Sequence, residues 1–256
     1  MTIEPSWPAI VDSGEGPPVV FIHPLGADHR FWDGLFSLIQ GRRLISYDLP
    51  GHGGRNETTS VYQIQDLADD LERLLDHCQI RSVSLVGVSI GGLVAQAFAA
   101  AHPDRTKSVV LVNTVAVYPE SFAANLTARA KLVQEESLES IIDATLNMWF
   151  TSKYLERDIE TVQLVRSMLL AASPNGYAQA CYALASADLQ SEVSQITAST
   201  TIICGSEDLA AFTDGAQWLH QAIEGSQLQW LKGSKHGAAL ESQTEFAETL
   251  ESVLPR

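Results

Sequence analysis

The sequence is poor in basic residues, and this shortage excludes several classes of partner. It has 16 lysine and arginine residues against 31 aspartate and glutamate residues, which gives a formal net charge of −15 at pH 7. Nucleic acids and anionic membrane surfaces attract cationic proteins, so neither is expected as a partner. An anionic substrate would be repelled at long range and would need a local cation at its binding site.

Cysteines are also few. Cys78, Cys181 and Cys204 lie far apart and lack the short spacing of metal ligands. We expect buried, reduced thiols, and the sequence gives no ground for a metal site or an organic cofactor. No basic and apolar leader follows Met1, and no apolar run approaches the length of a membrane-spanning helix. These absences predict a cytoplasmic protein without a membrane partner.

What is present indicates a packed core, because 45% of the residues are hydrophobic and 18% are charged. Apolar residues at helical spacing predict a helix at 64–77, and an alanine-rich helix is expected at 90–101. Residues 9–11 and 19–22 flank a turn-rich segment and are predicted to pair as an antiparallel hairpin. Further strands are predicted at 44–48, 83–88 and 108–113. This alternation favours a mostly parallel sheet covered by helices on both faces.

The pattern changes between residues 118 and 196, where no convincing strand is present. Helices are expected there at 124–135, 138–150, 155–170 and 176–185. Strands at 201–204 and 228–231 and a final helix at 243–253 then resume the alternation. We therefore predict an α/β core formed by residues 1–117 and 197–256, with a helical cap at 118–196. Such a cap would cover the carboxyl ends of the strands, where open α/β sheets bind ligands.

The clearest chemical motif is Gly-Val-Ser-Ile-Gly-Gly at residues 87–92, which follows the most apolar strand and opens the alanine-rich helix. This is the G-x-S-x-G pattern in the strand-to-helix context that it requires. Small residues are needed on both sides of the serine because side chains there would collide in the sharp turn. We predict that Ser89 is a nucleophile and that the N–H of Ile90 binds an oxyanion.

A serine hydroxyl needs a general base, and His236 is the best placed of the seven histidines. It lies in a polar loop between the last strand and the last helix, on the same edge of the sheet as Ser89. The acid that orients it is expected to precede it and to follow a strand, which favours Asp208. The adjacent Glu207 stays open on chemical grounds. The order serine, acid, histidine is that of α/β-hydrolases.

The loop that starts at His23 directly follows the strand at 19–22 and is expected to supply the second oxyanion donor. Pro24 has no N–H group, so Leu25 is the predicted donor. His23 begins this loop and is expected to lie near the substrate.

Together these motifs resemble the α/β-hydrolase superfamily over almost the whole chain, and more narrowly the 3-oxoadipate enol-lactonases. The resemblance implies a mostly parallel α/β-hydrolase sheet with an inserted cap, and an enzyme that cleaves a lactone or carboxylic ester through an acyl-serine. It is carried in the core by His23–Asp28, Tyr47–Gly53 and Gly87–Gly92, and in the cap by Arg129, Val133, Trp149–Thr151, Gly176–Cys181 and Ala187–Leu189. Departures from the family pattern include Leu126, Ser137, Ala210–Phe212 and Lys235.

An enol-lactone of this kind carries a free carboxylate. The resemblance therefore implies that Arg129 is the local cation that binds it, and that Trp149 forms an apolar wall of the pocket. A solvated arginine on a helix and a tryptophan in the core of the cap are the alternatives.

Other functions remain open on the same fold. A broad carboxylesterase or a C–C bond hydrolase would use the same triad, and a cofactor-free oxygenase would use histidine and acid. A ligand-binding receptor with vestigial catalysis is a further alternative, because fold alone does not fix function. The sequence leaves open whether the chain forms a homo-oligomer.

Overall fold

The structure, a computed structural model, describes residues 10–55 and 61–255. Within these residues seven strands form one sheet in the order β1-β3-β2-β4-β5-β6-β7. Strand β1 is antiparallel to β3 and every other pair is parallel, which confirms the predicted mostly parallel sheet. The strands are β1 (Ile10–Ser13), β2 (Pro18–Ile22), β3 (Arg43–Tyr47), β4 (Val83–Val88), β5 (Thr106–Val112), β6 (Ser199–Gly205) and β7 (Gln227–Leu231).

The predicted hairpin between residues 9–11 and 19–22 is wrong, and Ala9 itself lies outside the described residues. Strand β2 already has a parallel neighbour on each side, so β1 pairs with the outer edge of β3 instead. The connection between β1 and β2 passes tightly beneath the start of β3. A Cβ atom on Gly14 would lie 2.3 Å from the carbonyl oxygen of Arg42, and the φ angle of this glycine is +78°. The turn residues therefore serve a chain crossing rather than a hairpin.

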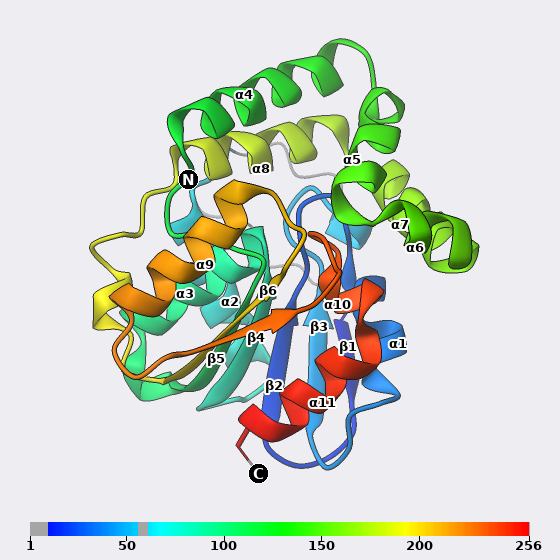
Figure 1. The fold of residues 1–256 in the computed structure, drawn as a ribbon. Helices are drawn as coiled ribbons and strands as arrows, with labels where there is room; N and C mark the ends of the chain where they lie inside the picture. The colour runs from blue at the N-terminus through cyan, green and yellow to red at the C-terminus, as the bar shows by residue number, and fades with distance from the viewer. Residues whose placement is uncertain (1–9, 56–60, 256) are drawn as a thin grey trace.

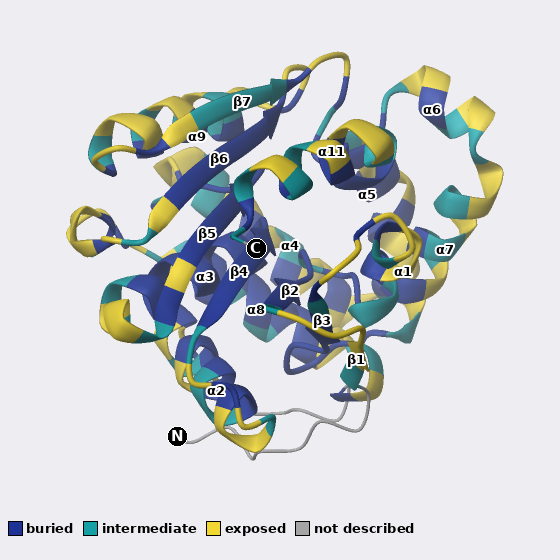
Figure 2. Ribbon diagram, turned by 90° about the horizontal axis from the view of Figure 1, so that it is seen from below, coloured by how far each residue is buried: buried dark blue, intermediate teal, exposed yellow. Residues whose placement is uncertain are grey.

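Helices cover both faces of the sheet (Figure 2). Strand β4 is buried along its whole length because α3 packs against it and against its neighbours β2 and β5. The predicted helix at 64–77 is confirmed as α2, whose apolar stripe is buried. One face carries α2 (Ile64–His77), α3 (Ile90–Ala101) and α9 (Ala210–Ala222), and the other carries α1 (Asp33–Phe36) and α11 (Gln243–Val253), with the short α10 (Ala238–Glu241) before it.

The segment between β5 and β6 folds as a layer of helices above the sheet (Figure 1). The segment predicted as one helix at 155–170 is two helices, because the Asp158 side chain accepts a hydrogen bond from the N–H of Thr161 (3.1 Å) and caps a new helix. The boundaries of the cap at 118 and 196 stay a prediction. The helices are α4 (Glu120–Glu135), α5 (Ile142–Trp149), α6 (Ser152–Arg157), α7 (Ile159–Ala171) and α8 (Pro174–Ser186).

All three cysteines are free thiols, Cys181 and Cys204 buried and Cys78 half-buried. Among the helices of residues 10–55 and 61–255, none combines the length and the apolar character needed to cross a membrane.

Candidate active site

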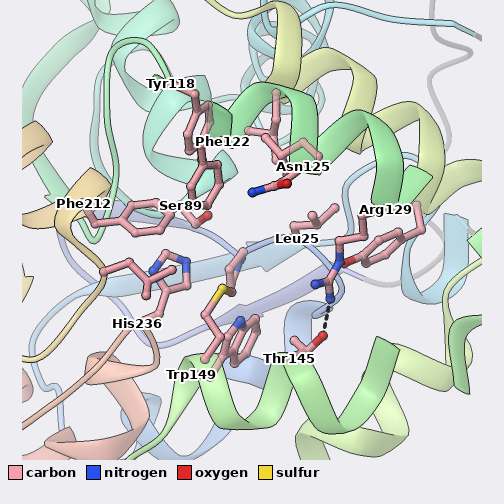
Figure 3. A pocket seen from close by; sticks show the side chains of 16 residues that line it. Leu25, Ser89, Tyr118, Phe122, Asn125, Arg129, Thr145, Trp149, Phe212 and His236 are labelled. Carbon is pink, nitrogen blue, oxygen red and sulfur yellow. Dashed lines mark hydrogen bonds between the residues drawn. The ribbon is translucent and has the colours of Figure 1, made fainter. Parts of the chain in front are cut away.

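Three loops that follow parallel strands meet beneath the cap. Ser89 follows β4, Asp208 lies just beyond β6, and His236 lies in the loop after β7. Ser89 and His236 line a cavity of about 270 Å³, whose other walls come from the loop after β2, from the cap helices and from the start of α9. Figure 3 shows both side chains at one end of this cavity. The three residues predicted as a triad are therefore brought together by the sheet.

The turn at Ser89 has the strained backbone of a strand-to-helix elbow. Its φ angle is 54°, which is costly for a residue with a side chain. A Cβ atom on Gly87 would lie 2.2 Å from the carbonyl oxygen of Gly91, and a Cβ atom on Gly91 would lie 2.2 Å from that of Ile22. Both glycines are therefore required by close backbone contacts, as the motif predicts.

The predicted base and acid form a buried pair. Nδ1 of His236 lies 2.8 Å from Oδ2 of Asp208, and both residues are buried. The N–H of Leu209 donates to the other carboxylate oxygen at 2.7 Å. Glu207, the alternative acid, is exposed. Its Oε1 lies near Gly233, 3.9 Å from the position that a Cβ atom on this glycine would take. The geometry therefore places Asp208, rather than Glu207, on the histidine.

Tyr118 is a polar neighbour of Ser89 that the sequence did not reveal. Tyr118 lines the same cavity as Ser89, and burial raises the pKa of its phenol above its ordinary value, with the nearby Ser89 hydroxyl acting in the opposite direction. In the described part of the chain, the Ser89 side chain forms no hydrogen bond with His236. Catalytic hydrogen bonds of this kind often tighten only when substrate binds. Tyr118 therefore lies near the predicted nucleophile in the wall of the cavity.

The cap is attached directly to the histidine loop. The N–H of Gly237 donates to the carbonyl oxygen of Trp149 at 2.7 Å. A Cβ atom on Gly237 would lie 2.7 Å from the ring of Phe150, so glycine is needed for this approach. The ring of Phe212 lies 4.2 Å from that of His236 and covers it from the side of α9. The imidazole is thus held by packing as well as by its carboxylate.

The loop after β2 presents the predicted oxyanion donor. The carbonyl oxygen of Pro24 lies 2.8 Å from Nδ1 of His23 and accepts from the N–H of Ala27 at 3.1 Å. In a trans peptide the following N–H, that of Leu25, points away from this carbonyl. Leu25 lines the cavity, and Ile90 begins α3, where a helix N–H has no acceptor within the helix.

His23 supports this loop from behind and does not line the cavity, contrary to the expectation that it lies near the substrate. Its Nε2 accepts from the N–H of Leu49 at 2.9 Å, so Nδ1 carries the proton that is donated to Pro24. Burial lowers the pKa of His23, which keeps the ring neutral. His52 is also buried away from the cavity. Of the buried histidines in residues 10–55 and 61–255, His236 alone lines the cavity with Ser89.

The opposite end of the cavity carries Arg129, from α4 (Figure 3). Its Nε donates to the Tyr177 hydroxyl at 2.8 Å and its Nη2 donates to Oγ1 of Thr145. The described residues offer this guanidinium no carboxylate partner, and its Nη1 has no acceptor among them. Two neutral hydroxyls therefore hold a half-buried cation in place and leave its charge available to a ligand.

Trp149 lies in the cap core and also lines the cavity, so both interpretations of this residue hold together. Its ring stands 6.0 Å from Phe31 and 6.4 Å from His236. Asn125 lies one helical turn before Arg129 and points into the cavity (Figure 3). Sequence reasoning missed Asn125, although its spacing of four residues from Arg129 places both on one face of a helix.

Comparison with known proteins identifies the family of this chain. A family model described as the alpha/beta hydrolase fold matches residues 17–242. The chain belongs to this family. It is 32% identical to 3-oxoadipate enol-lactonase 2 of Acinetobacter baylyi over 97% of this chain and 92% of that protein. The crystal structure of the enol-lactonase from Burkholderia xenovorans superposes with a TM-score of 0.90 at 30% identity, over 96% of this chain and 95% of that one.

A further solved relative of this hydrolase is a thermophilic esterase from Thermogutta terrifontis with malate bound. It superposes with a TM-score of 0.89 at 25% identity, over 95% of this chain and 91% of that one. The predicted resemblance to enol-lactonases, the fold and the assignment as a hydrolase are confirmed by these comparisons.

One group of possible metal ligands lies outside the cavity of this hydrolase. Ligand atoms of Asp28, His29 and Asp48 lie within 4.8 Å of one another. Each already has protein partners. Asp28 binds the guanidinium of Arg30 at 2.6 Å, and Asp48 contacts Nδ1 of His29 at 2.8 Å and accepts from the N–H of Gly54 at 2.7 Å. These bonds hold the loops that follow β2 and β3 together.

Proposed function

We propose that this hydrolase cleaves a small carboxylic ester or lactone that itself carries a carboxylate, with a 3-oxoadipate enol-lactone as the leading substrate. The observation that carries the proposal is that Ser89, His236 and Arg129 line one cavity. The proposed nucleophile, the proposed base and a positively charged side chain thus line one cavity, which a single small molecule can occupy.

The proposed reaction starts with attack of the Ser89 hydroxyl on the ester carbonyl, while His236 accepts its proton. Asp208 orients the imidazole and stabilises its protonated form. The N–H groups of Leu25 and Ile90 bind the oxyanion of the tetrahedral intermediate. Collapse breaks the ester bond, His236 protonates the departing enolate or alkoxide, and an acyl-serine remains. Water activated by His236 then hydrolyses the acyl-serine and restores the free hydroxyl.

Electrostatics support an anionic substrate. The chain has a net charge of −15, so an anion gains nothing from the long-range field. Among the described residues that line the cavity, Arg129 is the one arginine or lysine, and none is an aspartate or glutamate. A carboxylate there would form a charge-assisted bond with the guanidinium. The amide of Asn125 supplies a further donor on the same helix face.

Two measurements test this function. The first compares kcat/KM for freshly generated 3-oxoadipate enol-lactone with that for neutral esters of similar size. We expect the lactone to be favoured by at least about tenfold, as one charge-assisted bond provides. The second traps the acyl-enzyme by acid quenching and locates its mass increment at Ser89. An increment elsewhere, or none during rapid turnover, would contradict the mechanism.

A broad carboxylesterase is the second candidate. It is supported by the apolar wall that Trp149, Phe122 and Phe212 give the cavity, and by the likeness to the Thermogutta terrifontis esterase. Equal kcat/KM values for the lactone and the neutral esters would favour it. A small-molecule partner and a cytoplasmic location stay predictions. The three free cysteines agree with the predicted location.

A further inference from the structure

The two residues that directly follow β5 contact opposite ends of the proposed triad. Asn113 is buried, and its Nδ2 donates to Oδ2 of Asp208 at 2.6 Å. The same carboxylate oxygen lies 2.8 Å from Nδ1 of His236. Thr114 is also buried, and its Oγ1 donates to the carbonyl oxygen of Ser89 at 2.8 Å.

Several features show that the Asn113 amide is held for this contact. Its φ angle is 44°, a conformation in which asparagine is favoured over most residues. Its main-chain N–H donates to the carbonyl oxygen of Ile203 at 2.9 Å, which ties the turn to β6. Its Oδ1 is buried without a hydrogen-bond partner in the described chain. A buried amide oxygen without a partner is unfavourable. The amide nevertheless keeps this orientation, because the Asp208 carboxylate can accept a hydrogen bond from Nδ2 but not from Oδ1.

Thr114 is fitted to the elbow with equal closeness. A Cβ atom on Gly92 would lie 2.6 Å from Cβ of Thr114, so the second glycine of the motif makes room for this threonine. The Ser89 carbonyl also accepts from the N–H of Gly92 at 2.9 Å. The N–H of Ser89 donates to the carbonyl oxygen of Val112 at 3.0 Å, so the elbow is bound to the end of β5 on both sides.

We propose that Asn113 and Thr114 are positioning residues that set the triad from the end of β5, Asn113 through Asp208 and Thr114 through the Ser89 backbone. Strand β5 lies between β4, which leads to Ser89, and β6, which leads to Asp208. Two consecutive side chains at the end of β5 can therefore hold both residues. The proposal rests on the proposed function, because positioning Asp208 and Ser89 affects the rate only if these residues act as a catalytic triad. Neither Asn113 nor Thr114 is assigned a contact with the substrate.

The acid end is tested with Asn113→Asp and Asn113→Gly, both compatible with the backbone, through the pH dependence of kcat/KM. In N113D two carboxyls meet and share one proton at low pH, so the introduced carboxyl donates to Asp208 as the amide does. At higher pH both ionise and repel. Besides His236, the titratable groups against Asp208 are Cys204 and Tyr118, and burial raises the pKa of both, which keeps them neutral.

We therefore expect N113D to keep most of its activity on the acidic side of the pH profile and to lose about 10- to 100-fold on the alkaline side, relative to the unmodified enzyme at the same pH. N113G is expected to lose a similar factor in kcat at every pH with little change in KM. The acidic limb of the N113G profile of kcat/KM against pH should move to higher pH. The Asp208 carboxylate, once it has lost the Asn113 donor, stabilises the protonated His236 more strongly.

The nucleophile end is tested with Thr114→Val, which removes the hydroxyl, and Thr114→Ser, which keeps it. T114V is expected to lower kcat about tenfold with an unchanged pH profile, and T114S should restore it. Circular dichroism and thermal unfolding check that each variant is folded. Full activity of folded N113G and T114V, or an N113D profile parallel to that of the unmodified enzyme, would overturn the proposal. An active Ser89→Ala variant would instead refute the proposed function.

Discussion

The core side and the cap side of the cavity are built in different ways. On the core side, Leu25, Ser89 and His236 lie in loops that directly follow parallel strands, so the hydrogen bonds of the sheet fix their positions. On the cap side, Arg129 and Trp149 lie on helices whose positions depend on side-chain packing, chiefly of α4 against α8. Figure 1 shows the two layers meeting above the sheet.

This difference suggests a division of labour. Chemistry that tolerates little displacement is expected on the rigid layer, and substrate selection is expected on the layer whose helices can vary. The layers are joined at several points. One is the bond from Gly237 to Trp149, and another is the contact of Gly51 with Gly176, where a Cβ on either glycine would lie within 2.5 Å of the other's Cα.

The largest expected effect is on the core side. Ser89→Ala should remove about 10⁶ of the rate on p-nitrophenyl acetate and on the lactone alike, by analogy with other serine triads. Steady-state assays, with circular dichroism to verify folding, measure it. Turnover that survives above a few per cent would show that Ser89 is not the nucleophile.

The next effect concerns the acid. Asp208→Asn should lower kcat by about 10⁴, because an amide favours the wrong imidazole tautomer. Glu207→Gln makes the same chemical change one residue earlier and serves as the matched control, since that side chain is exposed. Equal losses in the two variants would contradict the assignment of the acid.

A smaller and selective effect is expected on the cap side. Arg129→Gln should reduce kcat/KM for the anionic lactone by about 10- to 100-fold and leave neutral esters nearly unchanged. Lys131→Gln, which removes an exposed positive charge from the same helix, controls for net charge. Loss on both substrate types would mean that Arg129 supports the fold of the cap rather than the substrate.

The smallest effect concerns stability at the junction of the two layers, where His52 lies near Tyr177. Burial lowers the pKa of His52 to about 3. Below its ordinary value near 6.5 the unfolded chain binds a proton that the folded chain does not, so stability falls as pH falls toward 3, by at most about 1.4 kcal/mol per pH unit. Urea unfolding at pH 7 and 5 should show a smaller fall in H52Q, whereas exposed His220→Gln should match the unmodified protein.

Most of the sheet and of its catalytic edge could be predicted from sequence, because apolar runs and turn motifs are local signals. The exception is instructive. Residues 9–11 and 19–22 look like a hairpin, but the partner of a strand depends on which edges are free, and β2 has none. In the cap, Asp158 is one capping residue within an apolar periodicity, so the break between α6 and α7 was not seen.

The sequence by itself determined the glycine-bounded elbow at Ser89 and the order of Ser89, Asp208 and His236 along the chain, and it predicted Leu25 as an oxyanion donor, because strand ends and glycine spacing are local signals. Only the tertiary structure decided that Asp208 rather than Glu207 meets the histidine and that His23 faces away from the cavity. It alone shows that Asn113 and Thr114 contact the triad and that Arg129 has no carboxylate partner among the described residues. These facts depend on contacts between segments far apart in the sequence, which no local pattern encodes.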